Sequence, residues 1–330
     1  MAPSRIIICS LFSLTLLAAA GALFEALAFR QDTQRFPRPV HLVDAGALRL
    51  NLHCTGRGKP TVILEAGLAD SLDSWSRVQP GIARLARVCS YDRAGYGYSD
   101  AGPMPRTSER IASELHSALA SAGETPPYLL VGHSYGGYNV RVFHGKYPQE
   151  VAAILLVDST QEDQYRLLPP AWVAMGAAAR LRASRQAFWA PLAIGLGVTR
   201  LQLRLQGRTV PPVILQSKYL RARASEFQNI EGSAEQARAS GHLGGKPLLV
   251  LTAGRLIDAA LAAALSAEDQ KAYQQTWITE LQPRLARLSS LGKQVIVPDS
   301  GHDIPSERPD AIIAGVRELI QATSSVTNTR

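Results

Sequence analysis

The amino-acid sequence predicts an α/β fold with a mostly parallel, doubly wound sheet, and three observations support this prediction. Short apolar segments that read as strands alternate along the chain with longer segments that read as helices. Two of these strands, residues 128–131 and 154–157, are apolar throughout, which is typical of strands buried on both faces of a parallel sheet. The sequence G-x-S-x-G follows directly after the first of them, at residues 132–136.

The order of elements follows from these apolar segments and from the turn residues between them. The first two strands are expected to form a hairpin that turns at Ala45-Gly46. The predicted strands are residues 40–43, 48–53, 61–64, 88–91, 128–131, 154–157, 248–252 and 294–297. Helices are expected at residues 75–86, 108–122, 277–288 and 309–322, the last beginning with a proline at a position that suits the first turn.

Residues 161–245 interrupt the alternation. This stretch is rich in Ala, Leu and Arg and has no clear strand, so we interpret it as an inserted helical cap. The core then comprises residues 38–160 and 246–322, and residues 323–330 are expected to form a disordered tail. The cap carries Trp172, Met175, Phe188 and Trp189, and we expect these side chains to line an apolar pocket.

The first 30 residues are expected to lie outside the fold. Residues 6–24 are apolar enough, and at about 1.5 Å per residue long enough, to cross one hydrocarbon core. Residues 26–28 read Ala-Leu-Ala, a sequence that suits signal cleavage, whereas the length of the apolar run favours an uncleaved anchor. Both interpretations predict a membrane-anchored or secreted protein.

Composition and charge narrow the classes of function. With 46% hydrophobic and 19% charged residues, the chain is not of the disordered class. Of the net charge of +8, residues 161–246 contribute +7, from 12 Lys and Arg against 5 Asp and Glu. No nucleic-acid-binding motif is present, so this excess predicts either contact with an anionic surface such as lipid headgroups, or a solvated helical face. The oligomeric state stays open.

The candidate nucleophile is Ser134, in the segment LLVGHSYGG at residues 129–137. A tight turn from a buried strand into a helix would present the serine hydroxyl above the sheet. Gly132 and Gly136 would remove side chains that collide in such a turn, and Gly137 would let the helix approach the sheet. A plain turn serine is the alternative interpretation.

Four segments together resemble the α/β-hydrolase fold family, of the esterase-like type with a cap between its sixth and seventh strands. They are LEAG at residues 64–67, SYDRAGYGYS at 90–99, the turn around Ser134, and SGH at 300–302. The resemblance covers roughly residues 40–322. It implies an eight-stranded, mostly parallel sheet and a serine, an acid and a histidine acting together, with no cofactor and no metal.

Within this resemblance, His302 is the candidate base, because it follows the last predicted strand just before the last helix. A serine hydroxyl becomes a good nucleophile only when a base takes its proton. His133 is next to Ser134 in the sequence, but neighbouring residues in such a turn point in different directions, so we expect it to pack beside the site.

The acid that orients the histidine has two main candidates. Asp158 stands directly at the end of a strand, where open α/β sheets build their sites, and it is the favoured choice. Asp258 lies after the seventh strand, the family's usual place, but four residues past Gly254, where the usual spacing is tighter. Other nearby acids are Glu162, Asp163 and Asp303.

The negatively charged oxygen that forms when the serine attacks an acyl group needs two hydrogen-bond donors. The resemblance implies the backbone N–H groups of Tyr135 and Leu68 for this role. The chain has Glu65-Ala66-Gly67 where many lipases carry His-Gly or a run of glycines, which argues against the classical lipases.

Three further features are interpreted as structural. Asp92, Arg93 and Trp75 are expected to hold the loop after the fourth strand by ion pairing and packing. Cys54 and Cys89 lie in strands that are antiparallel neighbours in the family, which predicts either a disulfide or two buried thiols.

The leading hypothesis is a serine hydrolase that cleaves a carboxylic ester or a related acyl bond of a small-molecule substrate through an acyl-enzyme at Ser134. A peptidase or amidase of the same fold would use the same residues. A haloperoxidase side activity and a non-catalytic ligand-binding relative are further alternatives, whereas Ser134 excludes a haloalkane dehalogenase, which needs a carboxylate nucleophile. Membrane association through residues 6–24 is expected.

Overall fold

The computed structural model describes residues 3–35, 40–207, 212–257 and 259–327. One eight-stranded sheet has the order β1-β2-β4-β3-β5-β6-β7-β8, and only β2 runs against the others. The strands are β1 (Leu42–Asp44), β2 (Arg49–Thr55), β3 (Thr61–Glu65), β4 (Val88–Asp92), β5 (Tyr128–His133), β6 (Val151–Val157), β7 (Leu248–Ala253) and β8 (Gly292–Val297). The predicted fold class and all eight strands are confirmed.

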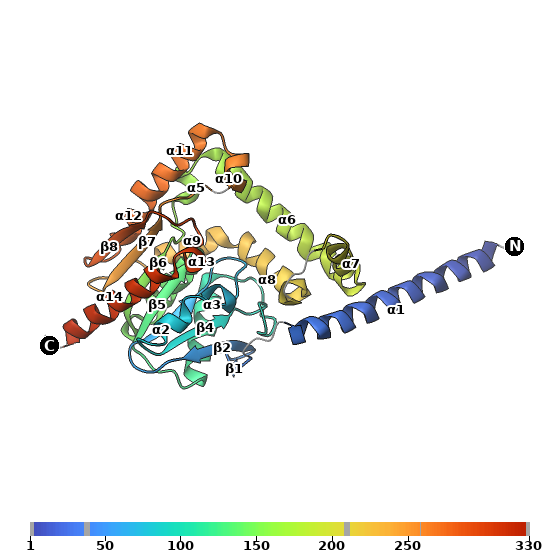
Figure 1. Ribbon diagram of the computed structural model, residues 1–330, viewed down its shortest axis with the longest axis horizontal. Helices are drawn as coiled ribbons and strands as arrows, with labels where there is room; N and C mark the ends of the chain where they lie inside the picture. The colour runs from blue at the N-terminus through green and yellow to red at the C-terminus, as the bar shows by residue number, and fades with distance from the viewer. Residues whose placement is uncertain (1–2, 36–39, 208–211, 258, 328–330) are drawn as a thin grey trace.

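Helices cover both faces of the sheet (Figure 1). On one face, α3 (Ser108–Ser121), α4 (Gly136–Lys146) and α9 (Ile230–Ala239) share a buried apolar cluster with alternate strand residues such as Leu130. On the other face, α2 (Gln79–Ile82) and α14 (Pro309–Thr327) pack against the opposite residues, such as Leu129. Burial on both faces explains why the central strands are apolar throughout.

The connection between β6 and β7 consists mainly of helices in its described residues. It contains α5 (Gln164–Leu167), α6 (Pro170–Gly195), α7 (Val198–Leu205), η3 (Pro212–Leu215), α8 (Ser217–Gln228) and α9. In Figure 1, α6 and α7 extend away from the sheet. In contrast, α9 buries Ile230, Ala234 and Ala237 in the same cluster as α4, so it belongs to the layer that covers the sheet.

Several expected helices differ from those observed, and prolines explain two of the differences. In place of one helix over residues 75–86, the chain forms a short 3₁₀ turn, η1 (Leu72–Trp75), and then α2. Pro80 lies in the first turn of α2, where its missing N–H is tolerated but could not continue a helix from η1. Residues 277–288 form a π-helical turn, η4 (Trp277–Leu281), and α12 (Gln282–Ala286), with Pro283 unable to donate a backbone hydrogen bond.

The remaining helices are η2 (Pro148–Glu150), α10 (Ala259–Ala264), α11 (Ala267–Thr276) and α13 (Ile304–Glu307). The expectation of a disordered tail from residue 323 was wrong for its first part, because α14 continues to Thr327 with the Thr323 and Ser324 hydroxyls bonded to the Ile320 carbonyl. Residues 328–330 lie outside the described residues.

The N-terminal segment forms one long helix, α1 (Pro3–Arg35). Within it, Ile8–Asp32 is long and apolar enough to cross a membrane, a property that signal sequences near an N-terminus share. Figure 1 shows α1 leaving the body beside α7 and extending outward. The expectation that the first 30 residues lie outside the fold was wrong for part of the helix, because Glu25 pairs with the buried Arg200 of α7.

Candidate active site

Ser134 stands at the turn between β5 and α4. Its φ of 51° lies in the left-handed region, which side chains other than glycine rarely adopt. The turn is closed by hydrogen bonds from the Gly137 and Thr160 N–H groups to the Ser134 carbonyl, at 3.0 and 3.1 Å. Strain of this kind persists only where the surrounding structure enforces it, and it presents the hydroxyl at the edge of the sheet.

The glycines around this turn are required by close packing. A Cβ on Gly132 would lie 2.7 Å from the Gly136 carbonyl oxygen, and one on Gly136 would lie 2.5 Å from the Glu65 carbonyl oxygen. A Cβ on Gly137 would lie 2.5 Å from the Ser159 Cβ. The predicted reason for these glycines is therefore confirmed, and Gly137 specifically makes room for the segment after β6.

The side chains of Ser134, His302 and Asp158 form one hydrogen-bonded chain, although 168 residues separate the serine from the histidine in sequence. His302 Nδ1 lies 2.6 Å from Asp158 Oδ2, and His302 Nε2 lies 3.0 Å from Ser134 Oγ. Because a carboxylate only accepts hydrogen bonds, Nδ1 carries the proton. Nε2 is therefore free to accept a hydrogen bond from the serine hydroxyl. The geometry is that of a nucleophile, a base and an orienting acid.

The buried Asp158 carboxylate is held from three sides. Its Oδ1 accepts hydrogen bonds from the Trp277 indole at 2.8 Å and from the Ala253 amide at 3.0 Å, while Oδ2 faces His302. The sequence did not single out Trp277, whose position depends on the π-helical turn η4. Asp258, the alternative acid, lies outside the described residues.

The other acids near the site have different partners. Glu162 pairs with Arg141, and Asp163 pairs with Arg238 and Arg284. Asp303 accepts a hydrogen bond from the Ser306 N–H at the start of α13.

The pKa of His302 is raised above its ordinary value by its surroundings. Desolvation lowers this pKa, but the hydrogen bond from His302 to Asp158 and the charge of Asp158 outweigh that effect, with help from Asp303 and Asp70. Burial, and then the nearby charge of His302, lower the pKa of His133 to about 4, so His133 is neutral at ordinary pH. Its Nε2–H donates to the His302 carbonyl at 3.0 Å, which places it beside the site as predicted.

Two backbone N–H groups next to Ser134 are free to bind a negatively charged oxygen. Those of Leu68 and Tyr135 make no hydrogen bond with any other described part of the chain. Leu68 follows Gly67, where a Cβ would lie 3.4 Å from the Ser134 Cβ, so the loop passes very close to the nucleophile. Both amides remain candidates for the oxyanion hole.

Arg93 fixes the loop that carries Leu68. Its guanidinium donates to the carbonyl oxygens of Ala66 and Gly67, each at 2.8 Å, to Glu65 at 3.0 Å, and to both carboxylate oxygens of Glu226 on α8, at 2.9 and 3.0 Å. All five N–H donors of the arginine are therefore used, and the group is buried.

The role predicted for Arg93 was too narrow, because it joins the loop after β3 to the helical connection rather than holding only its own loop. Glu65 ends β3, Asp92 ends the neighbouring β4, and Arg93 follows it. Carboxyl ends of parallel neighbours meet at one edge of the sheet, a signal that could have paired Glu65 with Arg93. Asp92 itself accepts hydrogen bonds from the Leu72 and Tyr98 N–H groups, at 3.1 Å each, and so holds the neighbouring loops as expected.

Two cavities meet at Ser134 and His302. One, of ≈ 520 Å³, extends along the loop after β3 towards Tyr96, Tyr219 and η3. The other, of ≈ 480 Å³, lies between α6 and the segment from α10 to η4, and is lined mainly by aromatic and aliphatic side chains: Tyr165, Trp172, Phe227, Ile230, Leu256, Leu261, Tyr273 and Trp277.

Of the cap side chains expected to line an apolar pocket, only Trp172 does so. Met175, Phe188 and Trp189 line neither cavity, and Phe188 and Trp189 are 71% and 66% exposed on the outside of α6. The expectation was wrong for these three because composition does not reveal which side of a helix faces inward.

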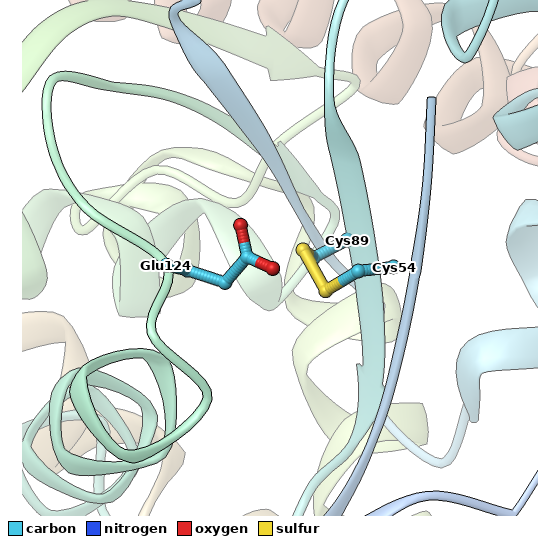
Figure 2. A group of neighbouring side chains, drawn as sticks. All are labelled: Cys54, Cys89 and Glu124. Carbon is cyan, nitrogen blue, oxygen red and sulfur yellow. A yellow bond between two sulfur atoms is a disulfide. The ribbon is translucent and has the colours of Figure 1, made fainter. Parts of the chain in front are cut away.

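Cys54, Cys89 and Glu124 lie together, as Figure 2 shows, and the atoms that could bind a metal ion are within 4.8 Å of one another. The register of β2 and β4 places Cys54 opposite Cys89, and a disulfide joins them. Metals bind thiolates, and the Glu124 carboxylate is already paired with Arg87 at 2.6 Å. The donor set does not suit a metal ion.

Comparison with solved structures supports the fold. A putative epoxide hydrolase from Pseudomonas aeruginosa superposes with a TM-score of 0.65 at 18% identity, covering 87% of this chain and 96% of that one. An esterase from Thermogutta terrifontis superposes with a TM-score of 0.59 at 22% identity, covering 87% of this chain and 99% of that one.

Sequence relatives lead to the same family. An AB hydrolase superfamily protein of Gibberella zeae is 27% identical over 80% of this chain and 87% of its own length. An uncharacterized Bacillus subtilis protein is 26% identical, but over only 49% of this chain and 50% of its own length. The human (lyso)-N-acylphosphatidylethanolamine lipase is 27% identical over 34% of this chain and 35% of its own length.

The family model described as alpha/beta hydrolase fold matches residues 60–250, which include β3 to β6, the whole connection after β6 and the first half of β7. The chain belongs to the α/β hydrolase fold family.

Proposed function

We propose that the protein is a serine hydrolase that cleaves a carboxylic ester or a related acyl bond of a small molecule. The observation that carries this proposal is the hydrogen-bonded chain from Asp158 through His302 to Ser134, at 2.6 and 3.0 Å, which opens on two cavities. The names of the Thermogutta esterase and the human lipase agree with acyl chemistry.

In the first half of the reaction, Ser134 Oγ attacks the acyl carbon while His302 Nε2 takes the hydroxyl proton. The imidazolium that forms is stabilised by Asp158. The oxygen that becomes negative accepts hydrogen bonds from the Leu68 and Tyr135 amides. The bond to the leaving group then breaks as His302 gives its proton to the departing oxygen, which leaves an acyl-enzyme.

In the second half, water attacks the acyl-enzyme. His302 takes a proton from the water, and the second tetrahedral intermediate then collapses. The bond from the acyl carbon to Ser134 Oγ breaks as His302 returns the proton to Oγ, which releases the carboxylic acid and restores the Ser134 hydroxyl. The aromatic-lined cavity suits an apolar acyl chain, and the other cavity remains for the leaving group.

Epoxide opening, named for the Pseudomonas structure, fits this site less well. Attack by Ser134 on an epoxide carbon would form an alkyl ether, which water does not cleave under mild conditions. A carboxylate nucleophile would instead form an ester that water can hydrolyse. The serine at this turn therefore favours acyl transfer.

A fluorophosphonate probe tests the proposal, because it phosphonylates an activated serine hydroxyl. We expect the full chain to be labelled at Ser134, and Ser134→Ala to remain unlabelled. A panel of esters and amides with matched acyl chains then identifies the bond that is cleaved. Failure to label the folded wild-type protein would overturn the proposal.

A further inference from the structure

The α6–α7 turn contacts the N-terminal helix without intervening side chains. A Cβ on Gly21 of α1 would lie 2.2 Å from the Leu196 carbonyl oxygen, and one on Gly197 would lie 2.8 Å from the Gly21 carbonyl oxygen. Only glycine at both positions permits such an approach. The level of Gly21 therefore marks where the body of the protein first meets α1.

Ion pairs hold the same contact. Arg200 of α7 is 5% exposed and forms two hydrogen bonds of 2.7 Å with the Glu25 carboxylate, and it also pairs with Asp32. Cleavage after Ala28 would remove Glu25, and the buried Arg200 guanidinium would lose both hydrogen bonds to that carboxylate. A buried charge that loses such a partner strongly destabilises the folded state. The contact therefore favours an uncleaved α1.

The apolar part of α1 beyond the contact is long enough to enter most of a bilayer core. Because Arg5 is charged, this part comprises residues 6–20, which rise by about 22 Å at about 1.5 Å per residue, against a hydrocarbon core of about 30 Å. Its large apolar side chains, such as Leu11, Phe12 and Leu17, are exposed. A bilayer around these residues would place its surface at the level of Gly21, and thus at α7 and the end of α6.

An exposed apolar surface lies at that level. Phe188, Trp189 and Leu192 of α6 are 71%, 66% and 63% exposed, and Leu201 and Leu205 of α7 are also exposed. These five residues are called here the α6–α7 face. On α7 this face adjoins Arg200 and Arg204, which contact α1, and no described residue covers Leu201 or Leu205.

The sequence segment that carries this face has charge of one sign. From residue 164 to residue 225 the sequence contains ten Lys and Arg and no Asp or Glu. Arg182 and Arg185 are exposed on α6 close to the face. Arginine side chains beside exposed tryptophan and leucine suit the boundary of a membrane with anionic headgroups, where Trp concentrates and cations are attracted.

We propose that the α6–α7 face is a second membrane contact, which rests in the headgroup layer of the bilayer that α1 crosses. The occupant is an anionic lipid surface, because the face is continuous with the membrane helix and its surroundings are basic. Contact at two places would fix the orientation of the body relative to the membrane, whereas α1 alone would leave it free to swing.

The test uses the full chain reconstituted in vesicles of phosphatidylcholine and phosphatidylglycerol whose acyl chains carry bromine, which quenches tryptophan on contact. Bromine near the headgroups should quench wild-type fluorescence more than bromine near the chain ends. Most of that difference should disappear in Trp189→Phe and persist in the matched control Trp172→Phe, because Trp172 lines an internal cavity. Far-UV circular dichroism establishes that each variant is folded.

Equal quenching of wild type and Trp189→Phe would overturn the proposal, and so would a chain that does not float with the vesicles. Protection of Trp189 from aqueous acrylamide without quenching by brominated lipid would show that a second copy covers the face, which also contradicts it. Because the readout is fluorescence, the result does not depend on the proposed hydrolase activity.

Discussion

The side chain of Ser134 contributes little to the stability of the fold. Its hydroxyl is hydrogen-bonded to His302, and its backbone conformation is fixed by the glycines around it rather than by its own side chain. A substitution that removes only the hydroxyl should therefore leave the fold unchanged. In contrast, Asp158 has three partners, so its replacement must preserve the side-chain shape.

We expect Ser134→Ala to lose a factor of about 10⁴–10⁶ in turnover, as serine hydrolases do when a member of the triad is removed.

Asp158→Asn should lose a factor of about 10⁴ in turnover, because an amide in place of the carboxylate favours the wrong histidine tautomer. Steady-state rates on an activated ester measure both. The unfolding midpoint should be unchanged in Ser134→Ala, and near wild-type turnover in either variant would contradict the proposed roles.

The pH dependence follows from the raised pKa of His302. The imidazole acts as a base only when neutral, so kcat/KM should fall as the pH drops through a pKa above the ordinary histidine value of about 6.5. Asp158→Asn removes the main group that raises this pKa, so the acid limb of its residual activity should move to lower pH. An unshifted limb would assign the titration to another group.

At the scale of elements, different helices of the connection between β6 and β7 contact the aromatic-lined cavity and the loop that carries Leu68. The inner side of α6 supplies Trp172 to the apolar cavity, and the outer side of the same helix presents Phe188. Glu226 of α8 binds Arg93, and Arg93 in turn binds the Gly67 carbonyl in the loop that carries Leu68. Substrate choice and the geometry of the proposed oxyanion hole are therefore expected to respond to different helices.

Trp172→Ala should enlarge the aromatic-lined cavity and raise the relative rate on longer acyl chains, because the indole fills part of that space. Phe188→Ala is the matched control on the same helix and should leave the preference unchanged with water-soluble esters. Rates on a series of p-nitrophenyl esters measure the preference. A shift in the control, or none in Trp172→Ala, would place the acyl pocket elsewhere.

Glu226→Gln should destabilise the protein by about 3 kcal/mol, because it leaves the buried Arg93 without one of its two carboxylates. Turnover should fall as well, since Arg93 holds the Ala66 and Gly67 carbonyls just before Leu68. Glu231→Gln is the control, because the exposed Glu231 pairs with Arg180 at the surface, where such pairs contribute about 0–1 kcal/mol. Urea unfolding and kcat together distinguish a positioning role from loss of fold.

The sequence predicted the elements whose burial is complete and failed where one side of a helix had to be chosen. The strands β5 and β6 could be found because both faces are buried and every position is apolar. The outward direction of Phe188 and Trp189 could not be predicted, since an apolar residue on a membrane-facing surface looks the same in sequence as one in a core.

The sequence predicted only part of the candidate site. Ser134, His302 and Asp158 could be proposed because each follows a strand, so the sheet brings them to one edge. The contacts of Arg93 with Glu226 and of Trp277 with Asp158 span 133 and 119 residues, and depend on how irregular segments fold back. No local pattern in the sequence encodes such contacts.

At the scale of the whole molecule, α1 and the α6–α7 face should affect how substrate is reached. η3 packs against α1 and supplies Val213 and Ile214 to the wall of a cavity at Ser134, so this cavity lies on the side of the body that the proposed membrane contacts would hold near the bilayer. The protein is therefore expected to act well on acyl lipids that remain in a bilayer.

We expect Phe188→Asp combined with Leu192→Asp to slow hydrolysis of an ester embedded in anionic vesicles, while the rate on a short water-soluble ester stays unchanged. Two carboxylates on the α6–α7 face would be repelled by the anionic lipid surface. Comparing the two substrates with the same reconstituted protein measures this split. Equal slowing on both would show that the substitutions damage the site itself.

The left-handed backbone at Ser134 also has a consequence for how this protein changes over generations. A serine in this conformation costs about 1–2 kcal/mol that a glycine avoids, and the entropic cost of glycine, about 0.5–1 kcal/mol, offsets only part of it. Ser134→Gly should therefore yield a chain that is more stable but cannot form an acyl-enzyme. A population selected only for heat resistance would drift towards glycine here, so the serine persists only while its chemistry is under selection.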